Sequence, residues 1–151
     1  MESLFHIQKA ASATYEIKRS KFLAHLIPFD RFDAEMERLK NEHPKARHYV
    51  YAYRHFNEHG QIVENQTDDG EPKGSSGKPS LNVLRGAGLI NTALITVRYF
   101  GGTKLGVGGL VRAYGTAANM AIEAADLLKY RELAELTFQV SYSNLERVKY
   151  M

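Results

Sequence analysis

The residue types best suited to chemistry lie in a glycine-rich segment, Arg98 to Arg112, between a predicted strand and a predicted helix. Glycine lets neighbouring backbone amides point the same way, and a helix N-terminus adds partial positive charge. Three side-chain cations bring full charges to the same segment. Together these are the components of a phosphate-binding site. The candidate anion-binding residues here are Arg98, Gly101, Gly102, Lys104, Gly106, Gly108, Gly109 and Arg112.

The standard nucleotide-binding motifs are absent from this segment. It has no Gly-x-x-x-x-Gly-Lys-Ser/Thr pattern, and Gly106-x-Gly108 is not followed by glycine at position 111. We therefore predict no nucleotide cofactor. The phosphates of a polymer fit better, because they need only positioned charge and amides. The alternative is a glycine-rich turn that lets the helix pack close to the sheet.

A second candidate segment is the loop from Asp68 to Pro79, which holds three glycines, two prolines and three acids. In a binding loop, Lys73 and Lys78 would meet an anion. The carboxylates Asp68, Asp69 and Glu71 are the candidate ligands for a divalent ion, but the register of a calcium-binding EF-hand is missing and no metal site is predicted. The composition favours the alternative of a solvated, flexible loop.

The third segment begins with Arg47 and His48 and continues into a predicted strand with tyrosines at 49, 51 and 53. Side chains two positions apart share one face of a strand, so the tyrosines form an aromatic face. Such a face could stack bases, as in proteins that bind single strands. Packing against the core or across strands is the better supported interpretation of the tyrosines. Arg47 and His48 are added to the candidate contact residues.

The distribution of charge points to the same part of the chain. Residues 1–71 carry 10 basic and 12 acidic residues, whereas residues 72–122 carry six basic residues and no acid. A long basic segment in an acid-rich chain indicates a surface that meets anions, although burial could equally exclude the acids. The chain has no cysteine, which excludes disulfides and thiolate metal sites. Its longest charge-free stretch has 12 residues, too few to span a membrane, so we expect a cytoplasmic protein.

Strands and helices alternate irregularly along the chain, which predicts an α+β fold. A polar loop is predicted at about residues 57–79. Strands are predicted at 13–17, 22–27, 48–53, 94–100 and 134–142, and helices at about 30–41, 81–87 and 110–128.

The segments Lys45–His48, Asp68–Pro79 and Val97–Tyr114 together resemble the YigZ/Impact family. The resemblance implies a ribosomal-protein-like βαβ fold similar to domain four of elongation factor G, with a mixed sheet and helices packed on one face. It implies an Impact-type domain at residues 1–132. Bacterial relatives carry a second, ferredoxin-like domain, so residues 133–151 are expected to be its incomplete beginning.

The family's eukaryotic members act in translational control, and nucleic-acid binding is the usual proposal for bacterial members. We therefore predict a binding protein associated with RNA, DNA or the ribosome and linked to translation regulation. One alternative is a metal-assisted enzyme on a phosphorylated small molecule, with Lys78, Arg98 and Lys104 holding the phosphate. Another is a module that binds a translation-control protein. No catalytic residue is predicted, and an enzyme is the less favoured class. The loop at 68–79 and the turn at 101–109 should lie side by side if they form one site.

Overall fold

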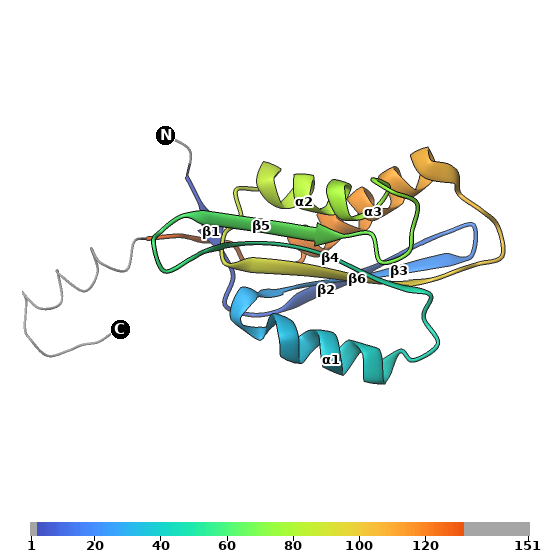
Figure 1. Ribbon diagram of the computed structural model, residues 1–151, viewed down its shortest axis with the longest axis horizontal. Helices are drawn as coiled ribbons and strands as arrows, with labels where there is room; N and C mark the ends of the chain where they lie inside the picture. The colour runs from blue at the N-terminus through green and yellow to red at the C-terminus, as the bar shows by residue number, and fades with distance from the viewer. Residues whose placement is uncertain (1–2, 132–151) are drawn as a thin grey trace, which may run out of the picture.

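The computed structural model of the protein describes residues 3–131 (Figure 1). A five-stranded sheet with the order β2-β3-β6-β4-β5 forms its centre, and a separate pair joins β1 to β7. None of the described helices is long and apolar enough to cross a membrane. The elements are β1 (Phe5–His6), β2 (Ala11–Ile17), β3 (Ser20–Pro28), the 3-10 turn η1 (Phe29–Arg31), α1 (Phe32–Glu42), β4 (His48–Phe56), β5 (Ile62–Thr67), α2 (Gly77–Gly86), β6 (Thr92–Tyr99), α3 (Gly106–Glu123) and β7 (Leu128–Lys129).

Helices cover both faces of the sheet (Figure 1). Because side chains alternate along a strand, Leu94 of β6 packs with α2 and α3, whereas Ile95 and Val97 pack with α1. The predicted α+β class is confirmed. The helices α2 and α3 pack on one face as expected, and α1 adds a layer on the other.

The sheet is antiparallel throughout rather than mixed. Each helical crossover joins two parallel strands that are not neighbours, because an antiparallel strand lies between them. The strands β3 and β4 run parallel on either side of β6, so β3-α1-β4 is a split βαβ unit. A second such unit, β5-α2-β6, encloses β4. The strands of the two units, without their helices, are related by a half-turn in the plane of the sheet. Since α1 and α2 lie on opposite faces, the two crossovers have opposite hands, and one is left-handed, which is uncommon.

Tyr49, Tyr51 and Tyr53 lie on the α1 face of β4. The ring of Tyr51 meets Phe32 edge-on at 5.0 Å between centroids, and Phe32 also meets Tyr53. The packing interpretation of the tyrosine face is therefore confirmed.

The predicted loop at 57–79 is wrong in its first part, because β5 occupies Ile62–Thr67. This strand lies at the sheet edge and is composed mainly of polar residues, so no apolar alternation marks it. Both later helices begin four residues earlier than predicted, at Gly77 and Gly106. The predicted strand at 134–142 and the expected second domain at 133–151 lie outside the described residues.

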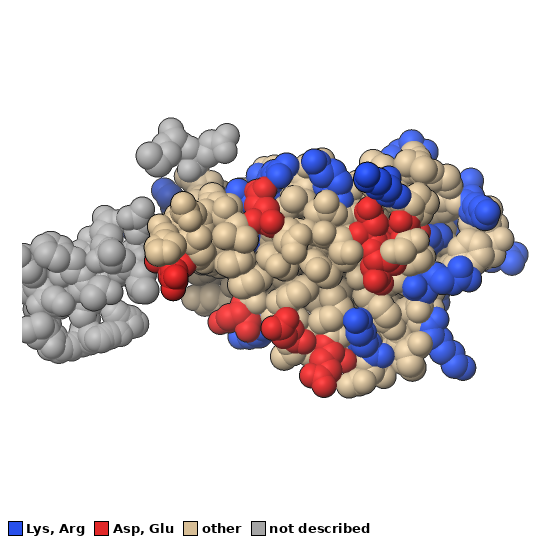
Figure 2. Space-filling view, viewed as in Figure 1, with Lys and Arg blue, Asp and Glu red and all other residues tan. Residues whose placement is uncertain are grey.

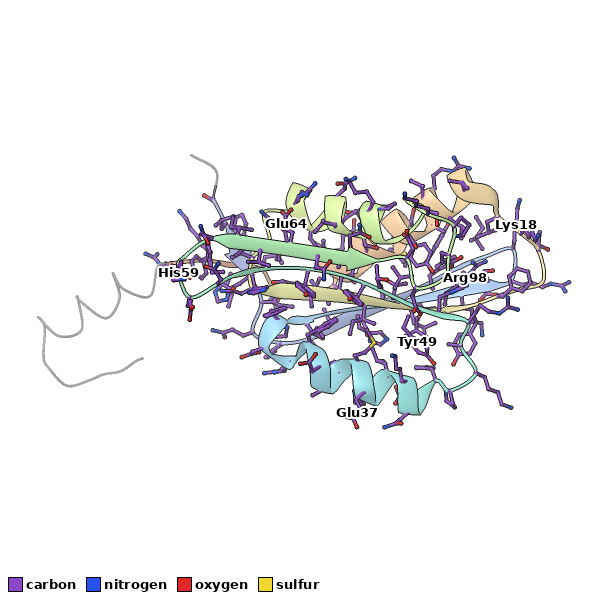
Figure 3. All side chains as sticks on the ribbon, viewed as in Figure 1. Lys18, Glu37, Tyr49, His59, Glu64 and Arg98 are labelled. Atoms are coloured by element: carbon purple, nitrogen blue, oxygen red, sulfur yellow. The ribbon has the colours of Figure 1, made fainter. Side chains whose placement is uncertain are left out.

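Four connections meet at one end of the sheet, on the right in Figure 1. They are the β2–β3 hairpin and the α1–β4, β5–α2 and β6–α3 loops. The register fixes this meeting, because Arg98 at the end of β6 pairs with His48 on one side and with Phe22 on the other. Figure 3 shows Lys18 and Arg98 toward this end and His59 at the opposite end. Segments far apart in sequence thus surround one site.

Candidate functional site

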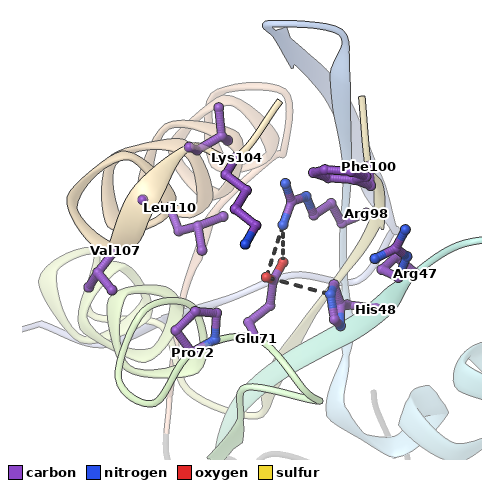
Figure 4. A pocket seen from close by; sticks show the side chains of 11 residues that line it. Arg47, His48, Glu71, Pro72, Arg98, Phe100, Lys104, Val107 and Leu110 are labelled. Carbon is purple, nitrogen blue, oxygen red and sulfur yellow. Dashed lines mark hydrogen bonds and ion pairs between the residues drawn. The ribbon is translucent and has the colours of Figure 1, made fainter. Parts of the chain in front are cut away.

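A pocket of about 390 Å³ lies where these connections meet (Figure 4). The predicted loop at 68–79 and the predicted turn at 101–109 both contribute to its walls, and the start of β4 closes a third side. The two segments therefore form one site. The lining residues are Arg47, His48, Glu71, Pro72, Arg98, Phe100, Lys104, Leu105, Gly106, Val107 and Leu110.

The floor of the pocket is a buried ion pair between Arg98 and Glu71. Both oxygens of the Glu71 carboxylate accept from Arg98 Nη1, at 2.9 and 2.8 Å. The Tyr114 hydroxyl donates to Glu71 Oε2 at 2.6 Å, and Arg98 Nη2 donates to Ser20 Oγ at 3.2 Å. Only 4% of Arg98 and 7% of Glu71 is exposed. Arg98 was predicted as an anion contact, but its charge is already balanced inside the protein.

His48 completes this network, and Tyr114 is held in it as a hydrogen-bond donor. His48 Nδ1 lies 2.7 Å from the carbonyl oxygen of Asp69, which can only accept, so Nδ1 carries the proton. The other ring nitrogen, His48 Nε2, lies 3.5 Å from Glu71 Oε1. Burial and the charge of Glu71 raise the pKa of Tyr114 far above its usual value, so this phenol remains protonated and donates to the carboxylate.

The three acids of the loop are occupied by protein partners. Asp68 accepts from the backbone amides of Gly74 and Gly77 at 2.9 and 2.8 Å, and Asp69 Oδ2 accepts from the Tyr49 amide at 2.7 Å. Glu71 holds Arg98. Within residues 3–131, no group of three or more His, Asp or Glu side chains is placed to hold a metal ion. Each of the three carboxylates that the enzyme alternative assigned to a metal thus already has a protein partner.

Five of the predicted cations are exposed, and none of them forms an ion pair with another described residue. Of these five, two line the pocket, Arg47 and Lys104. The Arg47 guanidinium also lies 4.9 Å from the centre of the Phe100 ring. The other three, Lys73, Lys78 and Arg112, are exposed but do not line the pocket.

The glycines of the 101–109 turn have different roles. Gly106 begins α3 with a positive φ of 77° and lines the pocket. Gly101 instead lies against the β2–β3 hairpin: a Cβ atom there would be 2.2 Å from the carbonyl carbon of Arg19 and 2.4 Å from the Ser20 nitrogen. Close approach to the hairpin backbone therefore explains Gly101, rather than the helix-to-sheet packing given above as the alternative. Gly102, Gly108 and Gly109 do not line the pocket.

Replacing Gly101 by alanine should destabilise the protein by about 1–3 kcal/mol, because one of two packed backbone segments must shift. Urea denaturation followed by circular dichroism measures the change. Gly115→Ala is the matched control, since a Cβ atom at Gly115 meets nothing within 4 Å and lies inside α3. That change should be neutral or stabilising, by up to about 1 kcal/mol. Equal effects at the two positions would contradict the close-approach role.

The structure adds residues that the pattern of the sequence did not single out as contacts. Lys18, Arg19 and Lys21 in the β2–β3 hairpin are exposed, and Lys18 and Arg19 have positive φ angles of 46° and 70°. Lys21 pairs with Tyr99, beside the pocket-lining Phe100. Figure 2 shows Lys and Arg side chains gathered at this end of the molecule. The basic run was visible in the sequence, but its nearness to the glycine-rich turn depends on strand pairing.

Comparisons with known proteins identify relatives of this chain. Residues 18–122 match the family described as the Impact N-terminal domain. The chain is 36% identical to the "IMPACT family member YigZ" of Escherichia coli (strain K12), over 99% of this chain and 74% of that protein. It is 31% identical to the "IMPACT family member YvyE" of Bacillus subtilis (strain 168), over 99% of this chain and 69% of that protein. A crystal structure described as that of a hypothetical protein has a TM-score of 0.77 at 33% identity, covering 91% of this chain and 73% of the other. The chain therefore belongs to the Impact family.

Proposed function

We propose that this protein binds nucleic acid, free or in the ribosome, and acts in translation regulation through the face around the pocket. The observation that carries the proposal is the joining of the 68–79 loop and the 101–109 turn around one pocket, with the exposed cations Arg47 and Lys104 at its edge. The regulatory part of the proposal follows the resemblance of the chain to a family whose eukaryotic members act in translational control.

The electrostatics of this face support a polyanion as ligand. Arg47 and Lys104 form no ion pair with another residue of the described range 3–131, so no carboxylate there is already bound to them. The three exposed cations of the β2–β3 hairpin widen the basic area beyond the pocket. Cations spread over several loops suit a ligand with repeated charges, and each phosphate they neutralise releases a counterion.

The double substitution Arg47→Ala with Lys104→Ala should weaken binding of labelled single-stranded RNA or DNA by at least about tenfold, because it removes two charged contacts. Fluorescence anisotropy at two or more salt concentrations measures it. The slope of log K against log salt should become shallower by about 1.4, that is, about 0.7 for each lost contact to a single strand.

Lys9→Ala is the control, because Lys9 is an exposed cation between β1 and β2, in the connection at the opposite end of β2 from the hairpin. It should leave the affinity nearly unchanged although it removes one positive charge, as each of the two tested substitutions does. Binding that is undetectable at low salt, or that does not respond to salt, would contradict the proposed function.

A protein partner is the second candidate, and the exposed apolar surface of α3 favours it. Val107 and Val111 are 53% and 38% exposed and lie one helical turn apart beside the pocket. An apolar strip next to cations suits an acidic protein surface. Purification from cells before and after nuclease treatment separates the two candidates, because only a direct protein complex survives the nuclease.

A further inference from the structure

The walls of the pocket have a different character from its edge. Pro72, Phe100, Leu105, Val107 and Leu110 line it with apolar surface, while Arg47 and Lys104 carry the charges. A surface that held only backbone phosphates would gain nothing from an apolar recess, because phosphate oxygens remain hydrated. The combination calls for a ligand with a flat apolar part and an attached anion.

We propose that the pocket accepts one unstacked nucleotide of a single-stranded nucleic acid, with its base against the apolar walls and its phosphate between Arg47 and Lys104. The inference rests on the proposed function and names its substrate class. The volume of about 390 Å³ falls within the range of pockets that hold small ligands and suits one nucleotide.

The floor of the pocket supports a neutral group rather than a phosphate at the bottom. The charges of Arg98 and Glu71 cancel each other at 2.8 Å, so the floor attracts neither sign strongly. His48 Nε2 lies 3.5 Å from Glu71 Oε1, longer than an ordinary N–H···O hydrogen bond, so this edge of the imidazole can take a polar partner from a ligand. A base edge carries neutral donors and acceptors that can pair with such groups, whereas a phosphate finds no unbalanced positive charge at this floor.

The edge of the pocket supplies the anion contacts. Figure 4 shows Arg47 and Lys104 on opposite sides of the pocket, with the Lys104 side chain directed toward the Glu71–Arg98 pair. Phe100 is 37% exposed, and the guanidinium groups of Arg47 and Arg98 lie 4.9 and 5.5 Å from the centre of its ring. Base stacking on an exposed aromatic ring is how single-strand-binding proteins gain affinity without reading sequence.

This geometry excludes a paired base. A base in a duplex must be unpaired and unstacked before it can enter a recess, at a free energy of a few kcal/mol. We therefore expect the protein to prefer a single strand over a duplex of the same sequence by about tenfold or more at equal salt.

The test compares labelled single-stranded RNA, single-stranded DNA and a duplex by anisotropy with the wild-type protein and two variants. Phe100→Ala should weaken single-strand binding by about 5- to 150-fold, the effect of losing one stacked base. Phe100→Trp keeps an aromatic ring and should retain most of the affinity. Ile62→Ala is the control, because Ile62 is similarly exposed at 43% and belongs to β5, outside the pocket. Circular dichroism melts show that each variant is folded.

The outcomes separate this inference from the proposed function. Equal binding of single strand and duplex, unchanged by Phe100→Ala but lowered by the Arg47 and Lys104 substitutions, would overturn the inference and leave the proposed function standing. Single-strand preference that is lost in Phe100→Ala and retained in Phe100→Trp supports it. Absence of nucleic-acid binding at low salt, or binding of a nuclease-resistant protein partner alone, would overturn both.

Discussion

Replacing Glu71 by alanine is expected to lower the free energy of unfolding by about 3–5 kcal/mol, because it leaves the Arg98 charge buried without a partner. Arg98 is only 4% exposed, and its Nη1 donates to both Glu71 oxygens. The Tyr114 hydroxyl also loses its acceptor, and an unsatisfied buried donor adds to the loss. Urea denaturation followed by circular dichroism measures the change, with the midpoint moving to lower urea at an unchanged slope.

Two further variants show whether the effect comes from the buried charge. Glu42→Ala removes a surface partner of Arg38, with the Glu42 side chain 56% exposed, and should change stability by no more than about 1 kcal/mol. Combining Glu71→Leu with Arg98→Met removes both charges and should recover part of the loss, since an uncharged pair no longer needs compensation. A loss below about 1 kcal/mol for Glu71→Ala would contradict this explanation, because it would mean that water reaches Arg98 in the variant and replaces the carboxylate.

This ion pair joins the 68–79 loop to the central strand of the sheet. Glu71, in the loop between β5 and α2, contacts Arg98 of β6 and Tyr114 of α3. Arg98 also donates to Ser20 at the hairpin. Counting His48, the groups of this network come from five separate stretches of the chain, so no local pattern could reveal it. Predicting Arg98 as a ligand contact was reasonable from its charge, and the structure instead makes it the balanced floor beneath the contact residues.

Features that depend on local periodicity or composition could be predicted from the sequence. The apolar run of β6 and the amphipathic α1 follow side-chain spacing. The charge segregation pointed to Lys104, and the basic residues before β4 pointed to Arg47; both line the pocket. The edge strand β5 could not be predicted, because Glu64, Asn65 and Gln66 give no alternation and only pairing with β4 makes it a strand. The hairpin cations were missed as contacts for the same reason, since their proximity depends on register.

The loop at 68–79 shows where composition misleads. Its glycines, serines and acids are typical of a flexible loop, yet Ser75, Ser76 and Gly77 are buried. The loop is ordered by Asp68, whose carboxylate accepts hydrogen bonds from the backbone amides of Ser76 and Gly77. These amides lie at the start of α2 and would otherwise lack partners. An acid eight residues before Ser76 lies outside any helix-capping pattern, because that pattern spans only the residues next to the helix.

Asp68→Ala is therefore expected to destabilise the protein by about 2–4 kcal/mol, more than an ordinary capping residue, because several donors, those of Ser76 and Gly77 among them buried, lose one acceptor together. The donors are the amides of Gly74, Ser76 and Gly77 and the hydroxyl of Ser76, at 2.8–3.2 Å. Asp126→Ala is the control, since Asp126 is exposed and should change stability by less than about 0.5 kcal/mol. An Asp68→Ala effect as small as the control's would mean that the loop is held without this carboxylate.

The same carboxylate makes the stability dependent on pH in a defined direction. Burial alone would raise the pKa of Asp68, but the hydrogen bonds from Gly74, Gly77 and Ser76 outweigh it and hold the pKa below the ordinary value of 3.8. A carboxyl group with a lowered folded-state pKa contributes stability fully above its unfolded pKa and loses it as the pH falls through the folded value. The difference in unfolding free energy between wild type and Asp68→Ala should thus be constant from neutral pH down to about 5 and shrink below about 4. Other carboxylates titrate in both proteins and cancel in this difference, so a difference that stays constant down to pH 2, or grows on acidification, would rule out the charged carboxylate as the group that orders the loop.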